Sequence, residues 1–398
     1  DDTAGNRLAV SNADIAANVG GVGFKYDNQQ PDSFVSLPAP GAYLKAPALT
    51  TISGTSIDYN NGSGVFETRI NIKRTADGGA TWRYWNGADW QVGDPDYPVS
   101  VTPVVDDDIN KIFIWSYGFG GWTDNYYYEF YIKSRDNAYN DTNPSPNWET
   151  PVMSSATYDT TSPTSRVVYP PSSGSNYAPA VATISGTAND ANIMASKVSL
   201  VDVAIKRLSD NLWWGGWSAP SWQSSSVLVF SSATIYNVWT SSVDWRYVVN
   251  TSIWDDTTSY YVISRARDRS INYETGWATN TFICDKTPPT SRITLPQDLS
   301  EVDNVSQITG TASDQSPGQL DRVAIIIYCV AGQDTPIQNK YWSVSQSQWI
   351  DSPEMINIPT SGPNWTWDAS GVAWAAKESP GYQYKLSVRA WDKANNKE

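Results

Sequence analysis

The sequence predicts an all-β protein made of three tandem β-sandwich domains, and three observations lead to this prediction. The composition favours strands and turns, with 23 Tyr, 20 Trp, 24 Pro and 26 Gly in 398 residues. Aromatic residues fit a pleated sheet, while Pro and Gly interrupt it at turns. No long stretch carries a helical apolar period of about 3.6 residues, so we expect almost no helix. The third observation is an internal repeat.

The repeat is clearest in a strand that ends on a polar turn. Glu129 to Asn140 recurs as Tyr260 to Asn272 and as Tyr382 to Asn396. The aspartates of these turns are 268 − 136 = 132 and 392 − 268 = 124 residues apart. The same spacings of 132 and 124 residues separate the glycines of an Ile-x-Gly-Thr signature, which are Gly54, Gly186 and Gly310. Spacings of 132 and 126 residues separate the linker aspartates, which are Asp27, Asp159 and Asp285. A fixed step in several elements is the mark of a repeat architecture.

The repeat divides the chain into four parts. They are a terminal segment of residues 1–25 and three repeats of residues 26–157, 158–283 and 284–398. Each repeat has roughly 125 residues, which is enough for a core of its own. We therefore expect three domains and a separate N-terminal strand.

The same elements follow one another within each repeat. A Pro-containing linker such as Asp285 to Pro289 stiffens the approach to a first strand, for example Ser291 to Leu295. The second strand carries the Ile-x-Gly-Thr signature and ends in an acidic loop. A strongly apolar third strand, a Trp-bearing hairpin and a strand through Trp115, Trp245 or Trp367 come next, before the strand described above. Seven short strands separated by turns predict a β-sandwich.

The two ends of the chain are out of phase with the repeat. Asp2 to Asn6 matches the turn Asp392 to Asn396, so Arg7 to Lys25 is predicted to be the last strand of a preceding or neighbouring domain. The third repeat correspondingly lacks its own last strand. Residues 7–25 of one copy can supply this strand to the third repeat of another copy, and such head-to-tail exchange forms a filament. A segment of a longer covalent repeat chain is the alternative.

The motifs resemble those of a known class of domains. The series Asp-x-Thr-x-Pro, Ile-x-Gly-Thr-Ala-x-Asp, Tyr-Trp-Asn-Gly and Arg-Ala-x-Asp-x-Ala-x-Asn is similar to the tandem immunoglobulin-like and fibronectin III-like repeats of large bacterial surface proteins and adhesins. The resemblance implies Ig-like sandwiches and a location at the cell surface. It is unspecific for function, because such repeats serve as stalks, adhesins and accessory modules. Two inserted loops, Pro95 to Asn110 and Gln223 to Thr240, depart from the shared pattern.

Composition excludes several functions. The net charge is −14 with a pI near 4.5, whereas binding to nucleic acid or anionic membrane needs clustered Lys and Arg. No apolar run reaches membrane-spanning length. The absence of His removes Ser-His-Asp and Cys-His catalysis and imidazole metal sites. The carboxylates shared by all repeats lie in turns, so we expect no enzyme activity and no catalytic residue.

Nine aspartates form the candidate metal site. In an Ig-like sandwich the linker, the loop after the second strand and the turn after the sixth strand meet at one end. Three sets follow: Asp27, Asp58 and Asp136 (the first set); Asp159, Asp190 and Asp268 (the second set); Asp285, Asp314 and Asp392 (the third set). Three carboxylates with backbone carbonyls are an oxygen-only site suited to calcium, which would stiffen the junctions. The alternative is that each Asp only caps its own turn.

The densest aromatic cluster is the candidate binding surface. Trp213, Trp214 and Trp217 surround two glycines in the second repeat. They can be read as a flat platform for a sugar or as a contact with another domain or subunit. The function we expect is structural, as part of an extracellular filament or surface fibre whose partners are copies of itself or adjoining repeats. A carbohydrate-binding or adhesive module with glycan partners is the alternative.

Overall fold

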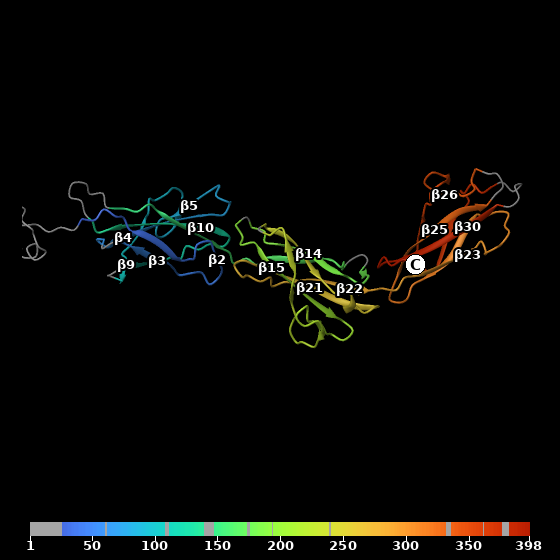
Figure 1. Cartoon of the computed structure of the whole chain (residues 1–398), viewed down its shortest axis with the longest axis horizontal. Coiled ribbons are helices and arrows are strands. Elements are labelled where there is room, and N and C mark those ends of the chain that lie inside the picture. Colours follow the sequence, from blue (N-terminus) through green and yellow to red (C-terminus); the bar gives the residue numbers. More distant parts are fainter. Residues whose placement is uncertain are drawn as a thin grey trace, which may run out of the picture. The chain divides into compact units, whose positions relative to one another are not determined.

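The computed structural model describes residues 26–59, 62–107, 111–138, 147–172, 176–192, 194–238, 240–331, 336–360, 362–375 and 382–398. These residues are essentially all strand and turn, as the sequence predicts (Figure 1). Their one helical element is a 3₁₀ turn, η1 (Thr251–Ile253). No helix among them is long and apolar enough to cross a membrane. The predicted terminal strand within residues 7–25 lies outside the described residues.

The chain forms two compact units, which together hold three pairs of sheets. Unit one consists of Asp1–Thr161, Ala191–Ser196 and Arg269–Asn272, and unit two of Ser162–Asp190, Lys197–Asp268 and Tyr273–Glu398. Unit one contains the first pair of sheets, and unit two contains the second and third pairs. Each pair corresponds to one of the predicted repeats, whose boundaries as independent domains stay a prediction.

The first pair packs a small sheet against a large one. The small sheet has the order β1-β3-β9-β8: β1 (Asp32–Leu37), β3 (Thr51–Ile57), β9 (Ile112–Gly118) and β8 (Val104–Asp107). The large sheet has the order β2-β11-β10-β4-β5-β6, with β7 also paired to β4: β2 (Ala42–Leu44), β11 (Val152–Tyr158), β10 (Tyr126–Asp136), β4 (Val65–Thr75), β5 (Arg83–Trp85), β6 (Trp90–Gln91) and β7 (Val99–Val101).

The second pair repeats this topology strand for strand. Its small sheet is β12-β14-β20-β19: β12 (Thr164–Tyr169), β14 (Thr183–Asn189), β20 (Ser242–Val248) and β19 (Thr234–Tyr236). Its large sheet is β13-β22-β21-β15-β16-β17, with β18 paired to β15: β13 (Tyr177–Ala178), β22 (Ala278–Cys284), β21 (Thr258–Asp268), β15 (Val198–Arg207), β16 (Trp213–Trp214), β17 (Trp222–Gln223) and β18 (Ser231–Ser232). The inserted loops therefore contain the short strands that cross from one sheet to the other, β7 with β8 and β18 with β19.

The third pair is smaller. One sheet is β23-β24-β29: β23 (Thr290–Leu295), β24 (Gln307–Ser313) and β29 (Asn364–Asp368). The other is β27-β26-β25-β28, with β30 paired to β25: β27 (Gln348–Ile350), β26 (Tyr341–Ser343), β25 (Leu320–Ala331), β28 (Ile356–Pro359) and β30 (Gln383–Asp392). Within the described residues, this pair has no strand equivalent to β11 or β22.

Alternating side chains build each core. In β10, Tyr128, Phe130 and Ile132 are fully buried, and the residues between them face outward, which is the two-residue period of a strand with one face against a core. A tyrosine near the start of the sixth strand is tied back to the preceding loop in every pair. The hydroxyls of Tyr128, Tyr260 and Tyr384 accept hydrogen bonds from the backbone N–H groups of Thr123, Asp255 and Ala375 at 2.6, 2.6 and 2.9 Å. Such a tyrosine corner is a hallmark of Ig-like sandwiches.

A buried glutamate joins the two sheets of the first pair. The Glu149 carboxylate accepts hydrogen bonds from the backbone N–H of Ser33 on β1 at 2.8 Å and of Ser134 on β10 at 2.5 Å. Glu274 binds Ser165 on β12 and the N–H of Ala266 on β21 in the same way. A charge-assisted bond to each sheet fixes their relative position. Burial raises the pKa of Glu149 to about 7.

Candidate metal centres

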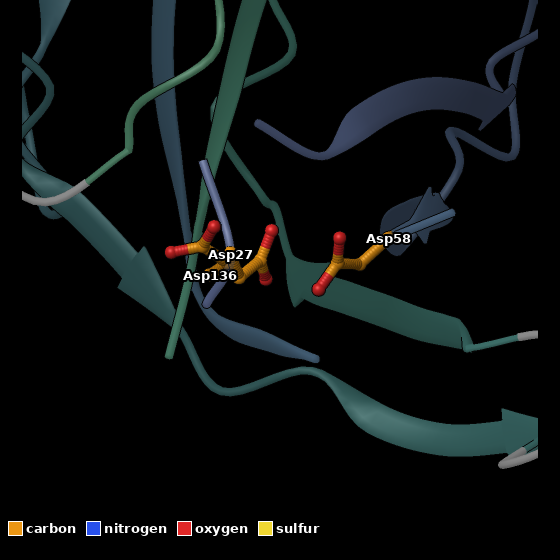
Figure 2. Close-up of side chains that lie close together, drawn as sticks. All are labelled: Asp27, Asp58 and Asp136. Atoms are coloured by element: carbon orange, nitrogen blue, oxygen red, sulfur yellow. The ribbon is translucent and has the colours of Figure 1, made fainter. Parts of the chain in front are cut away.

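The first set of aspartates converges as predicted. Asp27 belongs to the linker before β1, Asp58 follows β3, and Asp136 ends β10. Each offers a carboxylate oxygen, and these oxygens lie within 4.8 Å of one another. Figure 2 shows the Asp58 carboxylate facing those of Asp27 and Asp136. The three elements meet because the linker enters the sandwich at the end where the second and sixth strands leave it.

Turn capping explains part of this geometry but not all of it. Asp58 accepts a hydrogen bond from the backbone N–H of Gly64 at 2.6 Å, and Asp136 accepts one from Ala138 at 2.9 Å. These are the bonds that an Asp makes to its own turn. Asp27, however, accepts from the N–H of Ser63 at 2.5 Å, which lies 36 residues away in the chain and in another loop. The set therefore caps turns and also joins the loop after β3 to the linker.

The third set has the same arrangement, entirely within unit two. Asp285 lies in the linker after β22, Asp314 follows β24, and Asp392 ends β30. Their nearest carboxylate oxygens also lie within 4.8 Å of one another. One oxygen of each accepts a local backbone bond, from Thr287, Gln315 and Asn396 at 3.3, 2.8 and 2.8 Å.

The remaining oxygens of two members of the third set lack a donor. Asp285 is 1% exposed, and its Oδ2 atom has no hydrogen-bond partner among the described residues. The same is true of Asp314 Oδ2. Both oxygens face the same small space, because a Cβ atom placed on Gly318 would lie 2.4 Å from Asp314 Oδ2 and 2.7 Å from Asp285 Oδ2. Buried carboxylate oxygens without donors are costly unless a cation meets them.

The electrostatics of the third set also favour a bound cation. Burial, with the nearby charges of Asp392 and Asp314, raises the pKa of Asp285 to about 6. Burial also raises the pKa values of Asp314 and Asp392. In the part of the chain that the structure describes, no Lys or Arg forms an ion pair with any of the three. Like charges held together without a counter-ion attract either protons or a metal ion.

The second set is divided between the two units. Asp190 and Asp268, both in unit two, are buried and offer oxygens within 4.8 Å of each other. Asp159 belongs to unit one, where its carboxylate accepts hydrogen bonds from the N–H groups of Thr161 and Ser196 at 3.0 and 2.7 Å. It is also fully buried.

One partner of the aspartates was not assigned from the sequence. An asparagine side chain donates to the backbone carbonyl of the linker aspartate in each repeat: Asn147 to Asp27 at 3.4 Å, Asn272 to Asp159 at 2.8 Å, and Asn396 to Asp285 at 2.7 Å. Asn272 and Asn396 end the repeated turn motif, so the signal was present. In the first repeat the matching motif residue is Asn140, which lies outside the described residues, and Asn147 makes the bond.

The donor chemistry fits a hard cation. Each set offers only oxygen atoms, from two or three buried carboxylates and the backbone around them. Oxygen-only ligands suit Ca²⁺ or Mg²⁺, whereas zinc and copper sites use nitrogen or sulfur. Both cysteines, Cys284 and Cys329, are buried and unpaired, and neither belongs to a set. These acidic clusters can therefore hold a metal ion.

The three tryptophans of the predicted binding surface do not lie together on the surface. Trp213 is 7% exposed and packs with Ala204 and Ile263 on the outer face of the large sheet. Trp214 packs against Trp222 on the inner side of the same sheet. Adjacent residues of a strand point to opposite faces, so a platform containing both was not possible. Trp217 is 65% exposed, and its indole N–H donates to the carbonyl of Val248.

Comparison with known proteins adds little to this picture. No protein-family model matches the chain, and no curated protein matches it. Among solved structures, the chain is similar to Escherichia coli alpha-2-macroglobulin activated by porcine elastase, with 8% sequence identity and a TM-score of 0.21. The match covers 92% of this chain and 30% of that one, so the chain spans about a third of the length of that protein. The likeness is too weak to support an argument, and the Ig-like character rests on the topology and the tyrosine corners.

Proposed function

We propose that this chain is a structural repeat segment of an extracellular surface fibre, in which calcium ions bind the aspartate sets and hold each linker to its domain. The observation that carries the proposal is the recurrence of one oxygen-only cluster where each repeat begins. An enzyme needs one site, whereas a fibre needs the same joint at every junction. The sequence repeat extends the proposal to the second set.

Calcium suits these sets better than magnesium. Magnesium requires near-ideal octahedral geometry and keeps several waters, whereas calcium accepts six to eight oxygens in irregular geometry. Buried carboxylates drawn from a linker, a loop and a strand end form an irregular site. Extracellular calcium modules bind with Kd values of about 10⁻⁴ to 10⁻³ M. A stiffening role for sites of this strength would suit a fibre outside the cell, where calcium is abundant.

The test uses two neighbouring aspartates, Asp285 of the third repeat and Asp256 of the second repeat. Asp285→Asn removes a charge from the third set. Asp256→Asn changes a carboxylate outside the sets, which accepts hydrogen bonds from Lys286 and Thr287 of the same linker at 2.7 and 2.6 Å. Thermal unfolding of the purified chain is followed with calcium and with a chelator. We expect calcium to raise the unfolding midpoint of the unaltered chain.

The two variants should then respond differently to calcium. In Asp285→Asn, calcium should no longer raise the unfolding midpoint of the third repeat. With chelator, this variant should be at least as stable as the unaltered chain, because the repulsion between like charges is relieved. Asp256→Asn should lower the free energy of unfolding by about 1 kcal/mol with and without calcium. Calcium should still raise the unfolding midpoint of this variant. If Asp285→Asn keeps the full calcium-dependent rise, the third set does not bind calcium.

A further inference from the structure

The loop after the second strand donates two backbone hydrogen bonds to the first set of aspartates. Oδ2 of Asp27 accepts from the N–H of Ser63 at 2.5 Å, and Oδ2 of Asp58 accepts from the N–H of Gly64 at 2.6 Å. Ser63 and Gly64 stand two residues and one residue before β4. These two carboxylate oxygens therefore already have backbone donors.

The aspartates of the second set accept the same two bonds. Oδ2 of Asp159 accepts from the N–H of Ser196 at 2.7 Å, and Oδ2 of Asp190 accepts from the N–H of Lys197 at 2.9 Å. Ser196 and Lys197 again stand two residues and one residue before the next strand, β15. The donors thus keep their place before the third strand, although the loop is one residue longer than in the first repeat (65 − 58 = 7; 198 − 190 = 8).

The third set differs, because its loop is shorter and turns its N–H group elsewhere. Only six residues separate Asp314 from the start of β25 (320 − 314 = 6), and Gly318 stands where the other two repeats have the donor serine. The N–H of Gly318 donates to the carbonyl of Gln315 at 2.7 Å. Asp285 is 1% exposed, yet among the described residues its Oδ2 has no hydrogen-bond partner, and neither has Oδ2 of Asp314.

Gly318 also leaves the space beside these oxygens open. A Cβ atom on Gly318 would lie 2.4 Å from Oδ2 of Asp314 and 2.7 Å from Oδ2 of Asp285. It would also lie 2.7 Å from the carbonyl oxygen of Gln315. Three oxygens therefore border one small space that a larger residue would fill. Calcium accepts carboxylate and backbone carbonyl oxygens alike, so all three can serve as its ligands.

We propose that the third set is the calcium site of highest affinity in this chain, and that Gly318 sets this affinity by leaving one oxygen of Asp285 and one of Asp314 to the ion. The inference rests on the proposed calcium binding and ranks its sites. In the first and second sets an ion must share the matching oxygens with backbone N–H groups or displace those groups. The loss of one hydrogen bond to a charged group corresponds to about a tenfold change in affinity. The third set should therefore bind calcium about tenfold more tightly than the other two.

Calorimetric titration of chains altered in one set at a time tests the ranking. Asp27→Asn, Asp159→Asn and Asp285→Asn each remove the linker carboxylate of one set, and each chelator-treated chain is titrated with calcium chloride. We expect Asp285→Asn to lose the tightest binding step and the other two variants to keep it. A tightest step that survives Asp285→Asn, or three steps of equal affinity, would overturn the ranking while leaving calcium binding in place. No calcium binding to the unaltered chain would overturn the proposed function as well.

A second pair of variants isolates the role of Gly318. Gly318→Ala keeps every charge but places a methyl group against the oxygens of the third set, and the φ angle of Gly318 lies outside the left-handed region. Gly371→Ala is the matched control in the same repeat, because a Cβ atom there would meet nothing within 4 Å. We expect the tightest step to weaken about tenfold in Gly318→Ala and to stay unchanged in Gly371→Ala, with thermal unfolding in chelator confirming that both chains are folded. An unchanged tightest step in folded Gly318→Ala would overturn the proposal, and the titration of Asp285→Asn does not depend on the folding of this variant.

Discussion

At the scale of the residue, the aspartates cap turns and also converge in sets that could hold a metal ion, two roles that the sequence alone could not separate. Most of these aspartates make the local backbone bond expected of a capping Asp, for example Asp392 with Asn396. The same carboxylates also converge within 4.8 Å in each of the first and third sets. In Asp285 and Asp314 one oxygen caps the turn, and the other has no hydrogen-bond partner among the described residues. The second oxygens of Asp136 and Asp392 instead accept from the side chains of Asn147 and Asn396 at 3.0 and 2.8 Å.

The raised pKa of Asp285 predicts how stability depends on pH in the absence of calcium. Its pKa is about 6 in the folded chain, against an ordinary value of 3.8. The folded state therefore binds its proton more tightly than the unfolded state, so the contribution to stability is full below the ordinary value and is lost as pH rises through about 6. Calcium should remove this loss, because it favours the ionised form.

The measurement is the free energy of unfolding from pH 4 to 7 for the unaltered chain and for Asp285→Asn, with chelator. Subtracting the value for the variant from that for the unaltered chain leaves the contribution of Asp285. The contribution of Glu149, whose raised pKa acts in the same direction, is present in both chains and cancels. The stability of the unaltered chain relative to the variant should fall as pH rises through about 6. A difference that does not change with pH would contradict the assigned pKa.

At the scale of the element, the Ile-x-Gly-Thr signature is explained by one contact. The signature glycine of the second strand lies opposite a tryptophan of the neighbouring strand, as Gly186 does opposite Trp245. A Cβ atom on Gly186 would lie 2.0 Å from the carbonyl oxygen of Arg166 and 2.4 Å from the Trp245 ring. Gly54 and Gly310 meet the same obstacles in their own repeats. The glycine lets the indole lie flat on the backbone of the small sheet.

Gly186→Ala should therefore destabilise the second repeat by about 2–3 kcal/mol, because neither the backbone oxygen nor the buried ring can give way. Gly276→Ala is the control in the same repeat, since a Cβ atom there would meet nothing within 4 Å, and it should change stability by less than about 0.5 kcal/mol. Chemical denaturation of both variants measures the difference. Equal effects would mean that the close approach does not explain the signature.

Much of the fold and of the metal site could be predicted from the sequence, because the repeat aligns residues that the topology brings together. The predicted surface of Trp213, Trp214 and Trp217 conflicts with strand geometry. Trp213 and Trp214 are neighbours in one strand and point to opposite faces. The predicted strand through Trp367 is β29, and the tryptophan opposite the third signature glycine is Trp365, two residues before Trp367 on the same face.

Other features had no sequence signal that could have been read. The Glu149 carboxylate joins the two sheets from a position 13 residues after Asp136 (149 − 136 = 13), whereas Glu274 stands six residues after Asp268 (274 − 268 = 6). An insertion in the first repeat therefore hides the equivalence. The tyrosine corner was equally hidden, because one tyrosine among 23 does not identify its hydrogen bond.

At the scale of the whole molecule, one joint is repeated along the chain. The linker aspartates recur after 132 and 126 residues, and each is followed by a pair of sheets with related topology. A repeat in which each unit meets only its neighbours gains its stiffness from the junctions. If the proposed function holds, calcium at these junctions would make the stiffness of the repeat segment depend on the concentration of the ion.

Calorimetric titration of the chelator-treated chain with calcium tests this account most directly. We predict three ions bound per chain with Kd values of about 10⁻⁴ to 10⁻³ M, and loss of all three in a chain that carries Asp58→Asn, Asp190→Asn and Asp314→Asn. No saturable binding, or unchanged binding in the triply substituted chain, would contradict the central claim that the aspartate sets are calcium joints.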